Sequence, residues 1–389
     1  MIQIKRLAGV PLACAGLLIG SFTLAADRLG ASNPSPSLVA PENSTHAADR
    51  AAMLVIERRH RQSMFDALSA SDNPRERALA ALIDWFPVDK TRGLQRSQLI
   101  ARAADAAPDD ALVQWMAVLL LDSGPDSAFA DASEQALRRM QSLEPDNAAV
   151  WLQTLTSAAN AGDIGGVDTA LERMAASSVA DEHYAGVMKA LVDVYRGFPM
   201  PHRYFVLASR QTSREPVPPT TPQSMQFAMA NALASAVALP AYADLVDACE
   251  IDETSGRHAW RAQDCAAVGR LFAAKGDTLI SNRIGFALLR ASHTWTGRDV
   301  ANARTLDWLA YQESLAGWAA GAEAEDRNNA RIVNWIVSGS ELGSFRYDLA
   351  AHGVALTPPA GWVDSHSPFP AARLHEGAND AARRNSPSY

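Results

Sequence analysis

A repeated pattern in the first half of the chain constrains the fold more than any other feature. Residues 107–113 read Ala-Pro-Asp-Asp-Ala-Leu-Val, and residues 144–150 repeat them, 37 positions later, as Glu-Pro-Asp-Asn-Ala-Ala-Val. Residues 136–140 recur 34 positions later at 170–174. The unequal offsets indicate a loop insertion in the earlier unit, near residues 122–130. Segments that recur in the same order at such a period are typical of chains built from stacked structural units.

Each unit has the pattern of two amphipathic helices. A proline, Pro108 or Pro145, stops one helix, and the polar residue that follows it starts the next. An apolar stripe containing Trp115 or Trp151 comes next, then a polar turn such as residues 161–163, then a second amphipathic segment. The alternation of β-branched residues that indicates strands is missing. The sequence therefore predicts an all-α fold, an α-solenoid of antiparallel helix pairs.

A period near 34 residues with Pro145 and Trp151 at these places resembles the tetratricopeptide repeat family, whose units end in a proline and open with a tryptophan-containing helix. The resemblance covers about residues 95–200. Leu155 and Ala158 depart from the family pattern, which has a small residue and an aromatic residue there. The resemblance implies a right-handed superhelix whose concave face binds peptides or partner proteins.

A third unit is expected from Asp181, where Val187, Leu191 and Val194 form a helical stripe. Two clear copies are fewer than stacking normally needs, so a plain helical bundle with coincidental similarity is the alternative.

The N-terminus has the pattern of an export signal. Lys5 and Arg6 precede residues 7–26, a stretch of 20 residues without charge that ends in small side chains. This order of a basic segment, an apolar segment and small residues predicts a signal peptide cleaved near Ala25 or Ala26. The mature protein is then periplasmic or secreted.

Two other interpretations of the N-terminus stay open. An uncleaved inner-membrane anchor is one, since 20 residues just span a bilayer, although glycines and Pro11 weaken such a helix. Lipid attachment at Cys14 is the other. It fits poorly because Pro11 stands where bacterial lipoprotein signals carry a large apolar residue.

Composition divides the rest of the chain. Two terminal segments are rich in proline and serine and poor in apolar residues, which predicts that they do not fold. A proline-rich break separates two helical regions. The expected divisions are a signal peptide at 1–26, a flexible linker at 27–46, a repeat region at 47–212, a proline-rich linker at 213–224, a second helical region at 225–356 and a disordered tail at 357–389.

Several helix starts follow from capping chemistry. Asn73, Asp131, Asp277 and Asp299 each precede a helical pattern and are predicted to cap it. Gly276 is predicted to end the preceding helix in the left-handed conformation. Together, Gly276 and Asp277 indicate a tight antiparallel helix pair.

Two cysteines remain once Cys14 is removed with the signal. Cys249 and Cys265 lie on the apolar stripes of consecutive predicted helices. In an oxidising compartment their pairing leaves no odd thiol, so we predict a Cys249–Cys265 disulfide. It closes a loop of 15 residues and contributes roughly 3 kcal/mol to stability. Two buried free thiols are the alternative, and a catalytic thiol has only His258 nearby in sequence.

Large aromatic residues in the second region are predicted to be core. An aromatic stripe at helical spacing is more often core than a ligand groove, although a peptide or glycan groove is the alternative. The residues concerned are Trp308, Tyr311, Leu315, Trp318 and, in the closing helix, Trp335.

Two charge clusters are predicted to be solvated surface. The acidic cluster lacks the spacing of a calcium loop, and the basic run is predicted to be a helix face rather than a contact for acidic lipid or lipopolysaccharide. The first comprises Asp247, Glu250, Asp252 and Glu253, and the second comprises Arg58, Arg59, His60 and Arg61.

The sequence lacks the common motifs of catalytic and ligand-binding sites. The sequence has no spaced zinc ligands and no phosphate-binding loop, and residues 339–343 place a serine one position early for a hydrolase elbow. We therefore expect no catalytic residues, no metal and no cofactor, while the binding residues stay unknown. A net charge of −8 argues against nucleic acid as a partner.

These features favour an exported, non-enzymatic binding or assembly module of the cell envelope, with another envelope protein or a peptide as partner. Membrane contact is expected only through an uncleaved N-terminal segment. The alternative is an enzyme of unrecognised family with a site between the two helical regions, carried by His183, His202 and nearby carboxylates.

Overall fold

The computed structural model describes residues 44–84, 90–121, 127–211, 221–237, 242–251, 258–317 and 322–362. In this part of the chain the regular structure is sixteen α-helices and two short 3-10 helices, with no strand beyond an isolated bridge between Asn147 and Val179. The predicted all-α class is confirmed. The predicted signal peptide and its cleavage site lie outside the described residues.

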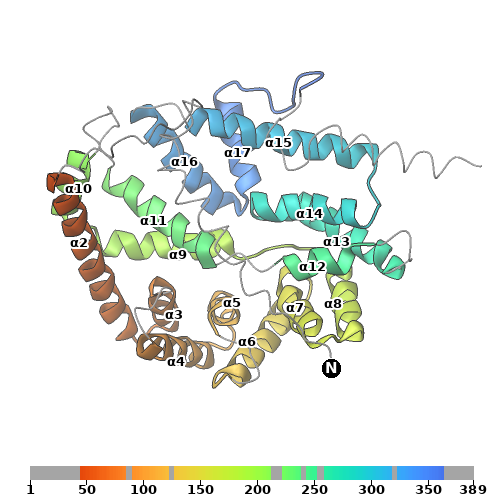
Figure 1. Cartoon of the computed structure of the whole chain (residues 1–389), viewed down its shortest axis with the longest axis horizontal. Helices are drawn as coiled ribbons and strands as arrows, with labels where there is room; N and C mark the ends of the chain where they lie inside the picture. Colours follow the sequence, from red (N-terminus) through yellow and green to blue (C-terminus); the bar gives the residue numbers. More distant parts are fainter. Residues whose placement is uncertain are drawn as a thin grey trace, which may run out of the picture.

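The first seven helices follow one another along an arc at one edge of the molecule (Figure 1). Helix α3 packs against α2, α4 and α5, while α5 pairs with α6 and α7 pairs with α8. These last two pairs coincide with the two predicted repeat units. The helices are α2 (Ser44–Ser69), α3 (Pro74–Ile83), α4 (Lys90–Ala106), α5 (Ala111–Leu120), α6 (Ala130–Leu143), α7 (Leu152–Ala161, after the 3-10 turn Ala148–Trp151) and α8 (Ile164–Ala176).

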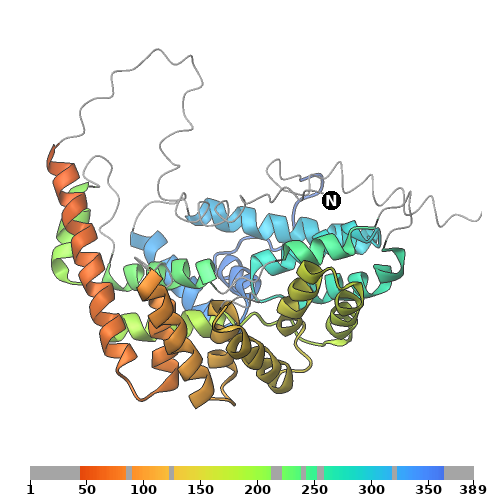
Figure 2. The same ribbon diagram turned by 60° about the horizontal axis from the view of Figure 1, so that its bottom comes forward.

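The next three helices leave the arc. Helices α9 (Tyr184–Gly197) and α11 (Pro222–Val237) lie side by side across its inner side, and α10 (His202–Gln211) packs against α2 (Figures 1 and 2). The helix expected after Asp181 is therefore present, and its predicted stripe is buried. Its main neighbours are α11 and α16 (Ala322–Ser338). The helices that pack against α7 and α8 are α12 (Ala243–Cys249) and α13 (Ala262–Lys275).

The second half is built around a close helix pair. Helices α13 and α14 (Leu279–Ala291) cross where two glycines face each other. A Cβ on Gly285 would lie 2.2 Å from the backbone nitrogen of Ala273, and one on Gly269 would lie 2.9 Å from the carbonyl oxygen of Gly285. Only glycine permits this approach of the two backbones. Helices α15 (Gly297–Gly317) and α17 (Glu341–Ala351) complete the fold, with a 3-10 turn at Ala259–Arg261.

One hydrophobic core runs through both predicted regions, since its buried residues extend from Met64 on α2 to Trp335 on α16. A smaller core lies among α14, α15 and α17. Helix α2 begins at Ser44, inside the predicted flexible linker, and α11 begins at Pro222, inside the predicted proline-rich linker. Across the described helices, none has the length and hydropathy needed to cross a bilayer.

The first residues of the predicted tail are ordered. Arg304 donates a hydrogen bond to the carbonyl oxygen of Pro359 at 2.6 Å, and the ring of Trp362 meets that of Trp308 edge-on at 5.1 Å. The prediction of disorder from residue 357 was wrong for residues 357–362, because a tryptophan there finds an aromatic partner on α15. Residues 363–389 lie outside the described part.

The predicted aromatic core is correct for part of the stripe. Trp308 and Trp335 are buried, whereas Tyr311 is 37% exposed and Leu315 is 50% exposed. The core prediction was therefore wrong for Tyr311 and Leu315, which follow Trp308 along the same stripe but are exposed on α15. Trp318 lies outside the described residues.

The predicted cap at Asn73 is confirmed, since the backbone N–H of Arg75 donates to Asn73 Oδ1 at 3.0 Å. Two other predicted caps, Asp131 and Asp299, do not cap their helices. Asp131 does not cap, since α6 begins one residue earlier, at Ala130. Asp299 sits in the first turn of α15 and accepts from the backbone N–H of Thr296 at 2.9 Å. Thr296 is the cap, and Asp299 is the reciprocal partner within a capping box.

The turn between α13 and α14 also differs from the prediction. Thr278 caps α14 and forms a capping box with Ser281, so Asp277 is free for another role. Gly276 has φ −57°, which is not the left-handed conformation. Glycine is needed there because a Cβ would lie 2.4 Å from Ser281 Oγ and 2.8 Å from the carbonyl oxygen of Phe272. Asp277 is therefore not a cap, and it lies in the interior, where it is 3% exposed.

Cys249 and Cys265 form the predicted disulfide-bonded pair. Their sulfur atoms are 2.02 Å apart and their Cα atoms 5.6 Å apart, and both residues are fully buried. Arg261 lies beside them and joins the end of α12 to α8, donating to the carbonyl oxygen of Ala248 at 3.2 Å and to Asp168 Oδ1 at 2.5 Å. The pair thus sits where the second half contacts the arc.

Candidate functional site

A groove of about 840 Å³ lies on the inner side of the arc, between α9 and the helices α2, α3 and α5. We call it the inner groove. Its floor is the exposed side of α9, and its walls are the end of α2 and the beginnings of α3 and α5. Helix α9 is placed there because its opposite side carries the buried stripe that packs on the core.

Three small residues lie in the floor. Gly186, Ala190 and Gly197 lie along one side of α9, spaced by about a turn or two. Between them, Lys189 Nζ donates to Asp193 Oδ2 at 2.8 Å, and both of these side chains are at least half exposed. The space beside the backbone is open at Gly197, where a Cβ would meet nothing within 4 Å, whereas a Cβ on Gly186 would lie 3.4 Å from Leu112 Cδ1.

The wall opposite is formed by two helix N-termini. Asn73 caps α3, and Asp110 caps α5 by accepting from the backbone N–H of Leu112 at 3.1 Å. Arg75 joins the two helices, because its Nε lies 2.5 Å from Asp110 Oδ2. The charge of Arg75 is thus already balanced within the wall.

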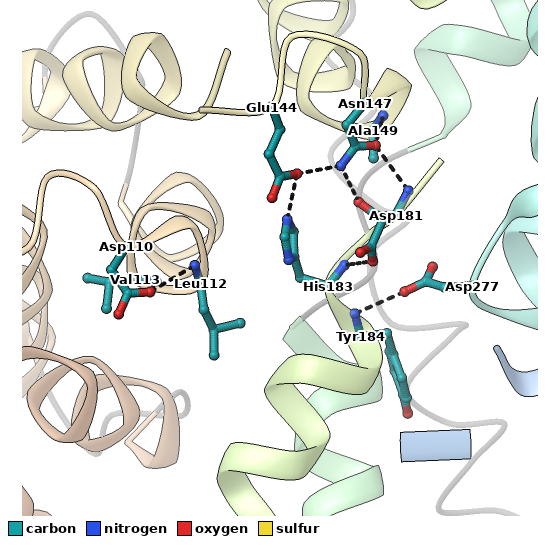
Figure 3. A network of polar contacts seen from close by, with 10 residues as sticks. All are labelled: Asp110, Leu112, Val113, Glu144, Asn147, Ala149, Asp181, His183, Tyr184 and Asp277. Atoms are coloured by element: carbon teal, nitrogen blue, oxygen red, sulfur yellow. Dashed lines mark hydrogen bonds and ion pairs between the residues drawn. The ribbon is translucent and has the colours of Figure 1, made fainter. Parts of the chain in front are cut away.

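His183 closes one end of the groove. Its Nε2 lies 3.0 Å from Glu144 Oε2 (Figure 3). Its ring packs 5.4 Å from the ring of buried Trp115. Burial lowers the pKa of His183, but the hydrogen bond to Glu144 and the charges of Asp181, Glu144 and Asp277 outweigh it, and the pKa rises. Burial raises the pKa of Glu144, but the His183 contact and a hydrogen bond from Asn147 outweigh it, and the pKa falls.

Asn147 organises the approach to His183. Its Nδ2 donates to Glu144 Oε2 at 2.7 Å and to the carbonyl oxygen of Asp181 at 2.8 Å. Its Oδ1 accepts from the backbone N–H groups of Ala149 and Asp181 (Figure 3). One side chain therefore starts the 3-10 turn before α7 and fixes the segment that leads into α9.

Residues 181–184, which we call the strap, connect this end of the groove to the second half. Glu182 accepts a hydrogen bond from Thr278 Oγ1 at 3.1 Å, and the backbone N–H of Tyr184 donates to Asp277 Oδ2 at 3.0 Å. The Tyr184 hydroxyl contacts Ser235 Oγ at 2.6 Å, and its ring stacks on that of Trp335 at 4.6 Å. Along the strap, Asp181 and His183 contact the turn at residues 144–147, while Glu182 and Tyr184 contact the turn at residues 277–278.

The remaining predicted residues lie elsewhere. His202 is exposed at the start of α10 and does not line the groove, so it does not join His183. Arg58 and Arg59 are exposed on α2, as predicted, whereas His60 is half-buried and its pKa is lowered by burial. Of the acidic cluster, Asp252 and Glu253 lie outside the described residues.

Sequence reasoning missed Glu144, Glu182 and Asp277 as parts of one site. Glu144 stood in the repeated motif beside Pro145, and Asp277 was interpreted as a cap. Among the described residues, no group of three or more histidines, cysteines or acids is arranged to hold a metal ion.

Comparisons with family models, with curated proteins and with solved structures found no match to this chain.

Proposed function

We propose that this protein is an exported, non-enzymatic binding module of the cell envelope, and that the inner groove holds a peptide or a segment of a partner protein. The observation that carries the proposal is the groove itself. It is about 840 Å³ in volume, lies on the inner side of a helical arc and has small and charged residues of α9 in its floor. A site of this size accommodates several residues of a peptide.

The chemistry of the lining favours binding over catalysis. The charged groups Arg75 and Lys189 are paired with Asp110 and Asp193 rather than directed at a common point. Among the described residues that line the groove there is no serine, threonine, cysteine or tyrosine to act as a nucleophile. Charges of both signs beside small residues suit a peptide, which presents polar side chains together with backbone N–H and C=O groups.

A tetratricopeptide-like solenoid is part of the proposal. It is supported by the pairs α5/α6 and α7/α8, by the contact of α3 with α5 and of α4 with α6, and by the packing of α12 and α13 against α7 and α8. In this arrangement α9, α10 and α11 interrupt the series of helix pairs, and α9 crosses the concave side and supplies the groove floor. Export rests on the charged and apolar N-terminal pattern of the sequence.

Filling the groove tests the proposal. Ala67 is an exposed groove residue on α2, and Ala51 is exposed on the same helix outside the groove. Ala67→Trp and Ala51→Trp therefore add the same bulk at two solvent-facing positions. Affinity capture from envelope extract should retain a defined partner with wild type and with Ala51→Trp, and lose it with Ala67→Trp. Equal capture by all three proteins would rule out the groove as the binding site.

One observation favours a second candidate, an enzyme that uses His183 as a general base. His183 faces the groove and is oriented by a carboxylate, which is how basic histidines are held in active sites. A hydrolytic or isomerising activity that His183→Gln abolishes, without loss of folding, would support it. Turnover unchanged in that variant would reject it.

A further inference from the structure

One edge of the molecule concentrates positive charge on its surface. Helix α10 packs against α2 and lies beside its N-terminal half, so the two helices form this edge together (Figures 1 and 2). We call residues 47–62 of α2 together with helix α10 the basic edge. The fold thus brings arginines from two distant parts of the sequence to one surface. The exposed ones are Arg50, Arg58 and Arg59 of α2 and Arg203 and Arg210 of α10.

Exposed acids do not accompany these arginines. Helix α10 contains no aspartate or glutamate, and the two acids of residues 47–62, Asp49 and Glu57, are half-buried. The next exposed acid along α2 is Asp66, beyond the basic edge. Arg58 and Arg59 form no ion pair with any residue that the structure describes. The basic edge is therefore strongly positive, although the whole chain has a net charge of −8.

Two exposed apolar side chains lie among the arginines. Leu54 is 57% exposed and Val55 is 46% exposed. Residues four apart lie on the same side of a helix, so Leu54 lies one turn from both Arg50 and Arg58, and Val55 lies one turn before Arg59. The solvent-facing side of α2 at the basic edge is therefore apolar in its middle and cationic at both ends.

The surface of an anionic bilayer suits both features. Arginine forms paired hydrogen bonds with phosphate oxygens, and its aliphatic stem lies along apolar groups while the guanidinium stays at the headgroups. Apolar side chains between the arginines gain free energy by entering the boundary between headgroups and acyl chains. The phosphate backbone of a nucleic acid would also bind the arginines, but it offers no apolar layer for Leu54 and Val55.

The place of the basic edge in the chain also favours a membrane. Residues 7–26 are the apolar segment that the sequence predicts to enter a bilayer during export. Helix α2 begins at Ser44, and the residues between them span at most about 60 Å. As long as the N-terminal segment lies in a bilayer, the basic edge is the described part of the protein nearest to it along the chain.

We propose that the basic edge docks on the anionic surface of a membrane, with its arginines at the lipid phosphates and with Leu54 and Val55 in the boundary layer beneath them. The net charge of −8 opposes contact through faces that lack this excess of arginines, so the charge distribution also orients the protein. Charges in water act over about 8 Å at physiological salt, so the side chains of the edge itself make the contact. This inference does not rest on the inner groove as a ligand site.

Flotation with phospholipid vesicles tests the docking on the full chain. The vesicles consist of phosphatidylcholine alone or of phosphatidylcholine mixed with anionic phosphatidylglycerol. Wild type should bind the anionic vesicles more tightly, and added salt should weaken the binding because it screens the charges. Equal binding to both kinds of vesicle, which insertion of residues 7–26 alone would give, would overturn the proposal. Absence of binding to the anionic vesicles would overturn it as well.

Removing two arginines locates the contact. Arg58→Gln with Arg59→Gln should lower the partition onto anionic vesicles about 25-fold, at about fivefold for each arginine near the surface. The control is Arg102→Gln with Arg270→Gln, which changes the net charge equally at exposed positions on α4 and α13 and should bind like wild type. Equal losses in the two double variants would mean that binding follows net charge rather than the basic edge, and would refute the docking.

Removing the apolar pair distinguishes a bilayer from other anionic partners. Leu54→Gln with Val55→Gln should lower the partition roughly tenfold, as expected when about 55 Å² of apolar surface no longer enters the lipid. Ile164→Gln with Val179→Gln is the control, because these side chains are 63% and 43% exposed on α8 and in the segment after it, and it should bind like wild type. Wild-type affinity after loss of the Leu54 and Val55 side chains would contradict the proposal. Tight binding of wild type to duplex DNA or to polyglutamate, with none to anionic vesicles, would assign the edge to another partner and also contradict it.

Ala67→Trp separates the docking from the proposed function. Ala67 lines the inner groove at the other end of α2, so its replacement should leave the partition onto anionic vesicles unchanged whether or not it abolishes partner capture. A loss as large as that in Arg58→Gln with Arg59→Gln would place the lipid contact at the groove and refute the docking at the basic edge. All the substituted side chains are exposed, so the circular dichroism spectra of the variants should match that of wild type.

Discussion

Replacing Gly285 by alanine tests how the second half is held together. The added Cβ would meet three backbone atoms: the nitrogen of Ala273 at 2.2 Å, the carbonyl oxygen of Gly269 at 2.6 Å and Ala273 Cα at 2.8 Å. Backbone atoms of a packed helix cannot rotate away as a flexible side chain does. Helices α13 and α14 must therefore separate, and the turn that carries Asp277 must move with them.

The expected cost follows from these contacts. Overpacking a core costs about 1–3 kcal/mol, and three backbone clashes place this case near the upper end. Alanine is favoured over glycine inside a helix by about 1 kcal/mol, which offsets part of the loss. We expect Gly285→Ala to lower the free energy of unfolding by about 2 kcal/mol.

Urea unfolding followed by circular dichroism measures the effect. Gly297→Ala is the matched control, since Gly297 begins α15 and a Cβ there would meet nothing within 4 Å. The control should be as stable as wild type or slightly more stable. If Gly285→Ala matches the control in midpoint and slope, the close approach of α13 and α14 does not exist and the position inferred for Asp277 has no basis.

Three further predictions concern covalent and titratable groups. Intact mass of exported protein with and without reductant should show the Cys249–Cys265 bond, and replacing both cysteines with alanine should cost roughly 3 kcal/mol of stability; free thiols in exported protein would contradict this. Glu144→Gln should lower the pKa of His183, measured from its ring proton shifts by NMR, because a hydrogen bond and a negative charge are lost; an unchanged value would mean that the pair is not formed. The pKa of Asp277 is raised to about 6 from 3.8, so its contribution to stability is fully present below about pH 4 and is lost as pH rises through about 6, by about 3 kcal/mol; Asp277→Asn should flatten that slope in denaturation curves taken across the range.

The sequence predicted what depends on local chemistry. Periodic apolar residues predicted the helices, the recurrence of residues 107–113 at 144–150 predicted the pairs α5/α6 and α7/α8, and Asn73 was identified as a cap from its neighbours. Pairing of Cys249 with Cys265 followed from counting, because the expected removal of Cys14 with the signal peptide leaves two of the three cysteines and one way to pair them.

What could not be predicted depends on contacts between distant segments. The local sequence does not determine whether α9 crosses the arc or continues it, because its buried stripe would suit either arrangement. Asp277 has the sequence context of a cap, and only the neighbouring Thr278, a competing cap, releases it to meet Glu182. Trp362 lies in a proline-rich segment that composition predicts to be unfolded, but its contacts with Trp308 and Tyr311 and the bond from Arg304 to Pro359 hold the segment on α15.

The claim that the inner groove is the binding surface is tested most directly by placing a photo-crosslinking residue in it. Lys189 is an exposed groove residue on α9, and Glu134 is an exposed residue of α6 outside the groove. Irradiation of the protein in its own cells should give a defined adduct from position 189 and none from position 134. The same adduct from both positions, or an adduct from position 134 alone, would contradict the claim.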